Sequence, residues 1–124
     1  MQFSRIDHVA LDVGDLERSI DFYTRHFGFR RYYDQTTPTG LKIGYLELGP
    51  TVLELVGRSA EHGISGFHFC LITDDFDVAV STLAGAGIPF VTPPHPTDAR
   101  KPEEKGWRRA VFRGPDGEHI EIRG

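Results

Sequence analysis

The sequence predicts an α+β fold made of two copies of one βαβββ unit. The segment that begins at His8 is repeated from His68, and in each copy an aspartate precedes an apolar stripe of helical period. The 124 residues suit a single compact domain over 1–124, with module 1 at about 4–57 and module 2 at about 64–124. We expect pseudo-twofold symmetry to join the modules as a curved mixed sheet around a trough.

Each copy opens with an apolar run typical of a strand. An aspartate follows, Asp15 or Asp75, where its carboxylate can accept hydrogen bonds from the free amides of a helix start. Apolar residues then recur at i, i+4 and i+7, which predicts an amphipathic helix that ends at a glycine. The first strands are predicted over 6–13 and 66–73, and the helices end near Gly28 and Gly87.

Three further strands complete each copy, separated by glycine and proline turns. The segment from Pro93 to Gly106 lacks an apolar period and is rich in proline, so we expect a mobile loop there, either a lid or substrate loop that borders the trough or a disordered segment. The polar stretch from Arg58 to Gly63 marks the module boundary. The additional strands are predicted over 28–35, 41–48 and 51–56, and over 87–94, 107–113 and 118–123.

Strand parity places a histidine and a glutamate on the same side in each copy, opposite the helix. Each glutamate lies between two apolar residues, and His68 lies between Phe67 and Phe69. His8 is out of step with the apolar face of Val9, Leu11 and Val13. A polar residue on a half-exposed strand is common, but matching pairs in both copies favour a metal site. The four candidate ligands are His8, Glu54, His68 and Glu121.

Other polar residues are candidates for substrate contact. His119 lies two residues before Glu121 and shares its predicted face. Arg109 belongs to a basic stretch between Arg100 and Arg113 that could bind a small anion or be solvated. We expect His95, in a loop context, to be solvated.

The bulk properties exclude several classes. A net charge of -4 argues against nucleic acid as the main partner. The N-terminal residues have no charged leader before an apolar run, and no stretch is long enough to span a membrane. The single cysteine, Cys70, permits no internal disulfide. We expect a cytoplasmic protein that acts on a small molecule.

The chain resembles the vicinal oxygen chelate superfamily of glyoxalases, bleomycin-resistance proteins and dioxygenases. The resemblance rests on IDHVALDVGDLERSIDFYTRHFGF, TVLELV, GFHFCLITDDFDVAV and FRGPDGEHIEI, and covers nearly the whole chain. The ligand set is similar to that of bacterial glyoxalase I. The resemblance implies one divalent ion (Ni, Co, Zn, Mn or Fe), a small-molecule substrate and a homodimer.

The resemblance also implies a reaction, proton transfer next to a metal-chelated carbonyl through an enediolate, with Glu121 or Glu54 as the base. Asp12 stands where bacterial glyoxalase I has an arginine for the carboxylate of glutathione, and Arg58 replaces an asparagine that contacts glutathione. A glutathione adduct is therefore a poor candidate substrate, although Arg58 is a candidate substrate contact. An Fe(II) extradiol-type dioxygenase and a non-catalytic antibiotic-binding protein are the alternatives.

Overall fold

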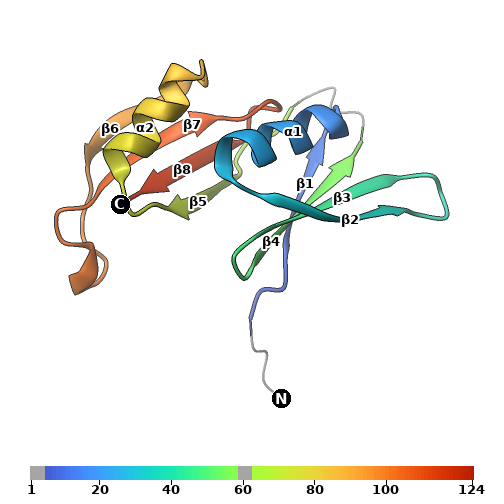
Figure 1. Cartoon of the computed structure of the whole chain (residues 1–124), viewed down its shortest axis with the longest axis horizontal. Coiled ribbons are helices and arrows are strands. Elements are labelled where there is room, and N and C mark those ends of the chain that lie inside the picture. Colours follow the sequence, from blue (N-terminus) through green and yellow to red (C-terminus); the bar gives the residue numbers. More distant parts are fainter. Residues whose placement is uncertain (1–4, 59–62) are drawn as a thin grey trace. The chain divides into compact units, whose positions relative to one another are not determined.

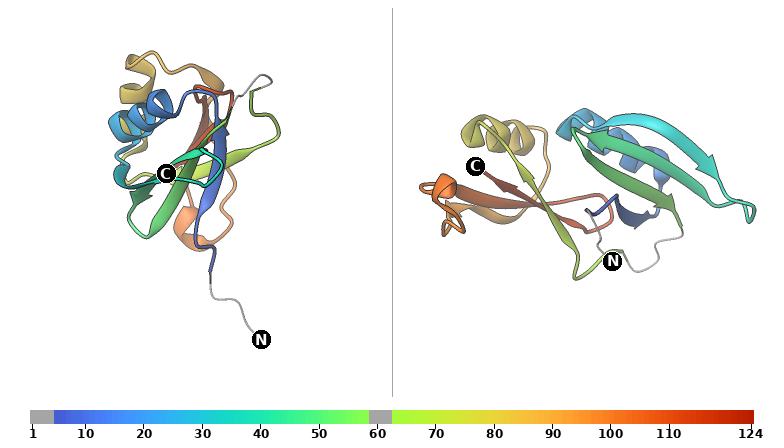
Figure 2. Two further views of the ribbon diagram at one scale, coloured as in Figure 1. Left: turned by 90° about the vertical axis from the view of Figure 1, so that its right-hand side faces the viewer. Right: turned by 90° about the horizontal axis from the view of Figure 1, so that it is seen from below.

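The computed structural model describes residues 5–58 and 63–124 (Figure 1). The chain divides into two compact units, Met1–Gly63 and Ile64–Gly124. Each unit has a four-stranded mixed sheet and one α-helix that crosses one face of that sheet (Figure 2). The predicted α+β class with two βαβββ units is confirmed. The predicted linker includes residues 59–62, which lie outside the described residues.

The sheet of the first unit has the strand order β1-β4-β3-β2. β1 and β4 are parallel, and the other neighbours are antiparallel. The first strand is shorter than predicted, because its ladder with β4 begins at Val9, so His8 directly precedes the strand. The elements are β1 (Val9–Val13), α1 (Leu16–Phe27), β2 (Arg30–Thr36), β3 (Lys42–Leu48) and β4 (Thr51–Gly57).

The sheet of the second unit repeats this topology, with the order β5-β8-β7-β6 and a parallel β5–β8 pair. A short 3₁₀ helix, η1, lies between β6 and β7. The elements are β5 (His68–Ile72), α2 (Phe76–Gly85), β6 (Phe90–Pro96), η1 (Pro102–Glu104), β7 (Arg108–Arg113) and β8 (His119–Arg123).

Both helices begin at the predicted aspartates. Asp15 accepts a hydrogen bond from the Arg18 amide at 3.1 Å, and Asp75 accepts one from the Val78 amide at 3.2 Å. These bonds satisfy amides that have no partner inside the helix. α1 ends at Gly28, whose φ of 75° is the left-handed conformation that glycine adopts without strain.

The alternation predicted for the last strand of each unit is present. Leu53 and Leu55 are buried in the core of the first unit, so the Glu54 side chain points to the opposite face. Ile120 and Ile122 are buried in the second unit in the same way, with Glu121 opposed to them. Burial of these flanking residues fixes the strand register, and the register aims the two carboxylates.

The expectation of an irregular loop from Pro93 to Gly106 is wrong in part. β6 continues to Pro96 at the edge of its sheet, where proline is tolerated because no ladder donor is needed. Glu104 is only 1% exposed and binds Arg100 and Arg123, so η1 is anchored to the unit. None of the helices in the described ranges is long and apolar enough to cross a membrane.

Candidate metal-binding site

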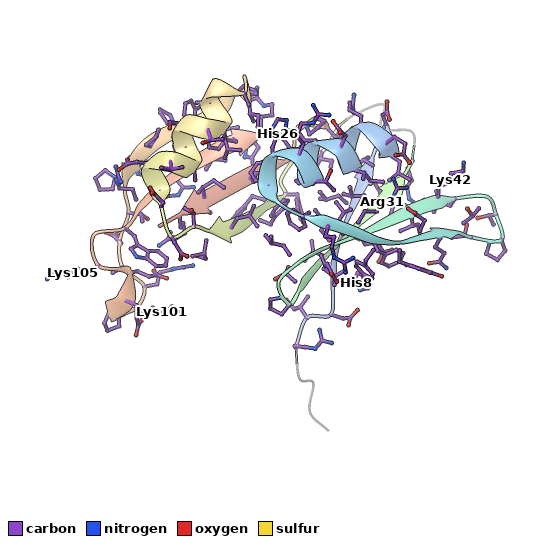
Figure 3. All side chains as sticks on the ribbon, viewed as in Figure 1. His8, His26, Arg31, Lys42, Lys101 and Lys105 are labelled. Carbon is purple, nitrogen blue, oxygen red and sulfur yellow. The ribbon has the colours of Figure 1, made fainter. Side chains whose placement is uncertain are left out.

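The first unit brings His8 and Glu54 together. The strand ladder pairs Ala10 with Glu54, which places the end of β1 beside the middle of β4. His8 Nε2 lies 3.0 Å from Glu54 Oε2. The Glu54 side chain is 13% exposed and that of His8 is 43% exposed, so a solvent-derived ion can reach the imidazole. Figure 3 shows His8 on the side of the strands away from α1.

Asp7 contacts the other ring nitrogen of His8. His8 Nδ1 and Asp7 Oδ2 are 3.0 Å apart. With a carboxylate facing each nitrogen, the Asp7 hydrogen bond and, less strongly, the Glu54 charge raise the pKa of His8. A cation bound between Nε2 and Glu54 would replace the proton on that nitrogen. A carboxylate behind a ligating histidine is a common outer-shell arrangement in metal proteins.

The second unit brings His68 and Glu121 together more loosely. His68 Nε2 lies 3.8 Å from Glu121 Oε2, and the ladder pairs Cys70 with Glu121. The Glu121 side chain is 11% exposed and that of His68 is 65% exposed. The pair therefore has the same composition as His8 and Glu54, at the equivalent positions of the repeated fold.

Two arginines hold the second oxygen of Glu121. Arg109 Nε donates to Oε1 at 3.0 Å, and Arg123 Nη1 lies 3.6 Å from the same oxygen. Burial opposes ionisation of Glu121, but the Arg109 hydrogen bond and the charges of both arginines outweigh it, so the pKa of Glu121 is lowered. Oε1 thus faces the arginines, while Oε2 is the oxygen nearer to His68.

Behind Arg123 lies a buried ion-pair network. Arg123 Nη2 lies 3.1 Å from Glu104 Oε1, and Arg100 donates to both oxygens of Glu104. The side-chain hydrogen bond from Arg100 is the main reason that the pKa of Glu104 falls to about 2. This network fixes the arginine next to Glu121 from behind.

The other predicted contacts lie in different places. His119 is the ladder partner of His68 and shares the face of Glu121, as expected from its spacing. Arg58 pairs with Asp12 at 3.1 Å, beyond the end of β4, whereas His8 lies at the start of β1. The structure thus groups His119 and Arg109 with the second pair and separates Arg58 from the first.

The donor set suits a divalent ion of the borderline class, because imidazole and carboxylate are ligands for Ni²⁺, Co²⁺, Zn²⁺, Mn²⁺ and Fe²⁺. Ligand atoms about 2.1 Å from an octahedral ion lie about 3.0 Å apart when adjacent. The His8–Glu54 distance of 3.0 Å matches this, and the His68–Glu121 distance of 3.8 Å is wider. Within the described part of either unit, no group of three or more His, Cys, Asp or Glu side chains is placed to hold a metal ion, so each unit by itself offers two donors.

Two polar residues of this region were missed in the sequence. His95, expected to be solvated, lies half-buried on β6 opposite Arg109, and its Nε2 is 3.0 Å from Arg109 Nη1. The prolines around it hid the strand. The sequence contains one indication of the role of Asp7, which is its position directly before the candidate ligand His8.

A family model for the Glyoxalase/Bleomycin resistance protein/Dioxygenase superfamily matches residues 5–122. The chain belongs to this superfamily. Its relatives include the uncharacterized protein YwbC of Bacillus subtilis (strain 168), 33% identical over 95% of each chain. The lactoylglutathione lyase GLX1 of Arabidopsis thaliana is 28% identical over 95% of this chain, which spans only 43% of that superfamily member. The resemblance to the vicinal oxygen chelate superfamily is confirmed.

Solved structures of the same fold include an antibiotic binding protein and a resistance protein. TnmS3, an antibiotic binding protein from Streptomyces sp. CB03234, has a TM-score of 0.78 and 26% identity, covering 98% of this chain and 96% of its own. The fosfomycin resistance protein FosX of Listeria monocytogenes, complexed with Mn(II) and sulfate, also has a TM-score of 0.78, with 99% and 91% coverage. At 15% identity, the second likeness shows the fold alone.

Proposed function

We propose that this protein is a metal-dependent lyase or isomerase of the glyoxalase I-like type. In this proposal His8, Glu54, His68 and Glu121 bind one divalent ion, and a proton moves on a carbon next to a carbonyl. The observation that carries the proposal is the repetition of one His–Glu pair at equivalent positions of two units. Membership of the superfamily is consistent with it.

When bound, a divalent ion would polarise the substrate carbonyl and stabilise the negative charge that develops as the neighbouring C–H loses its proton. The two histidines orient and hold the site; a neutral imidazole that binds through Nε2 has no free lone pair there for a proton. The proton is therefore left to a carboxylate, and we assign it to Glu54 or Glu121.

The two glutamates have different surroundings. Among residues 5–58 and 63–124, His8 is the side chain that lies within ion-pair distance of the Glu54 carboxylate. Arg109 and Arg123 hold Glu121 at its Oε1 atom. A carboxylate with one partner can turn toward a substrate at lower cost than one held by two guanidinium groups. Substitution of each by glutamine decides which of the two accepts the proton.

The surroundings also bear on the substrate. Asp12 takes the place of the arginine that would bind the carboxylate of glutathione, and the neighbouring Arg58 is already paired with Asp12. We propose His119 and Arg109 as substrate contacts because both lie on the face of Glu121. We also propose that the substrate is a small molecule other than a glutathione adduct and that the protein acts as a homodimer.

The test combines metal content with proton exchange. Protein purified with each divalent metal is assayed by elemental analysis, and α-hydroxy acids, α-keto acids, thiohemiacetals and acyl-CoA esters are screened for deuterium uptake in D₂O by NMR. We expect about one ion per complete four-ligand site and uptake at the carbon next to the carbonyl. His8→Ala should lose the ion, while His26→Ala on α1 should keep it. Absence of bound metal from wild-type protein at saturating supply would refute the proposal.

A second candidate function is capture of a planar molecule without catalysis, as favoured by an aromatic group near Glu54. Tyr45 is the ladder partner of Glu54, and its ring lies 5.3 Å from that of Tyr33 and 6.2 Å from that of Tyr32. Tyr33 is 55% exposed, so this surface can stack against a ligand. The likeness to the antibiotic binding protein TnmS3 agrees with this alternative. Tight binding of an aromatic drug by metal-free protein would support it.

A further inference from the structure

We propose that Arg109 is a substrate-binding residue that selects a ligand with a carboxylate close to its metal-chelating oxygens. This inference rests on the function proposed above and names the class of its substrate, a small organic acid.

Arg109 is held at two points. Its Nε donates to Glu121 Oε1 at 3.0 Å, and its Nη1 lies 3.0 Å from His95 Nε2. His95 Nδ1 lies 2.7 Å from the carbonyl oxygen of Pro96, which can only accept a hydrogen bond. His95 is therefore protonated on Nδ1, and its Nε2 accepts from the guanidinium. Such restraint on both sides reduces the ordering cost of binding a ligand.

The guanidinium retains donors for a ligand. No hydrogen bond joins Arg109 Nη2 to another residue within the described ranges, and the side chain is 28% exposed. A planar guanidinium with free N–H groups binds a carboxylate more specifically than a lysine ammonium does.

The position of Arg109 next to the candidate ligand Glu121 sets the distance to the chelating atoms. The Glu121 carboxylate lies between Arg109 and His68, because its Oε1 atom binds Arg109 and its Oε2 atom is the oxygen nearer to His68. A ligand held on the Oε2 side would therefore have its nearest substituents within reach of Arg109. This favours a carboxylate that is only a few bonds from the chelating oxygens.

The charges around Glu121 also favour an anionic ligand. Arg100, Arg109 and Arg123 face the two carboxylates of Glu104 and Glu121, so this cluster has an excess of positive charge. A divalent ion on Glu121 would increase that excess. A carboxylate on the substrate would offset it, whereas a neutral substrate would leave the guanidinium and the ion to repel each other.

The test uses two probes that share one hydroxamate chelating group and differ in a second group. They are malonic monohydroxamate, which carries a carboxylate, and its isosteric amide. Binding of each to Co²⁺-loaded protein is measured by calorimetry. We expect the wild-type protein to bind the carboxylate probe about 10- to 100-fold more tightly, the worth of a charge-assisted contact. Arg109→Gln should reduce this ratio to about one, and Arg109→Lys should keep part of it.

A matched control and a second readout separate ligand binding from a structural role. Arg108→Gln, on the same strand, should leave the ratio unchanged, because Arg108 pairs with Asp77 and contacts the Phe76 ring instead. Arg109→Gln should also bind Co²⁺ a few-fold more tightly, measured against a chromophoric chelator, because a repelling charge is removed. A merely destabilised site would lose metal affinity.

The outcomes distinguish the two proposals. Equal binding of the two probes by metal-loaded wild-type protein, or an unchanged ratio in Arg109→Gln, overturns the role of Arg109 and leaves the metal site standing. Failure of the wild-type protein to bind Co²⁺ overturns the proposed function and, with it, this inference.

Discussion

Asp7→Asn tests whether His8 binds a metal in the way that its surroundings indicate. Asp7 is the partner of His8 Nδ1 at 3.0 Å, and its side chain is 75% exposed, so the substitution removes a charge from the surface without disturbing the core. Asparagine keeps a carbonyl oxygen that can accept the Nδ1 hydrogen. The change therefore isolates the negative charge behind the imidazole.

The expected effect is about a tenfold loss of divalent-ion affinity at low salt. The Asp7 carboxylate lies 3.0 Å from the near ring nitrogen, so an ion on the far side is on the order of 7 Å away. In a water-like dielectric, attraction between one negative charge and a divalent ion at that distance is worth about a factor of ten. Outer-shell partners of metal ligands have comparable effects, about 10- to 100-fold. At physiological salt, screening should reduce the loss to a few-fold.

The assay is competition for Zn²⁺ or Co²⁺ against a chromophoric chelator, at low and physiological ionic strength. Asp12→Asn is the matched control, because Asp12 is also an exposed aspartate, forms an ion pair with Arg58 and lies away from His8. NMR titration of His8 without metal should show a lower pKa in Asp7→Asn, since the Asp7 hydrogen bond raises it. Equal metal affinities for wild-type protein and Asp7→Asn at low salt would refute the assignment of His8 Nε2 as a ligand backed by Asp7.

Glu54→Gln and Glu121→Gln identify the base. The variant that removes the base should lower turnover by about 100- to 10,000-fold, while elemental analysis should still find the metal. Normal turnover in both variants contradicts the proton-transfer mechanism. Glu104→Gln should lower the melting temperature near neutral pH. Because the pKa of Glu104 falls from 4.5 to about 2 on folding, its stabilisation is present above about 4.5 and is lost as the pH falls toward 2, so the two melting temperatures should converge in acid. Light scattering should give twice the 13.9 kDa chain mass, and a monomer mass at micromolar concentration contradicts the homodimer.

Local sequence signals determined the secondary structure and the direction of the glutamates. The side chains of Asp15 and Asp75 accept hydrogen bonds from amides of the first helical turn, so an aspartate before an apolar stripe indicates the start of a helix. Alternation in β4 and β8 assigns Glu54 and Glu121 to the face away from the helix, because burial of the flanking residues leaves the strand no other register. The repeat itself identified the matching histidines.

Tertiary structure decided which side chains meet those candidates. Arg109 lies twelve positions before Glu121, and only the antiparallel pairing of β7 and β8 brings them to 3.0 Å. His95 joins them because β6 pairs with β7 at Arg109, in a strand whose prolines resemble a loop in the sequence. Such contacts depend on which residues of neighbouring strands are paired, and alternation within a single strand does not specify the partner residue. The sequence by itself therefore determined the candidate donors, and the fold decided that, among the described residues, one glutamate is paired with a histidine while the other is also held by arginines.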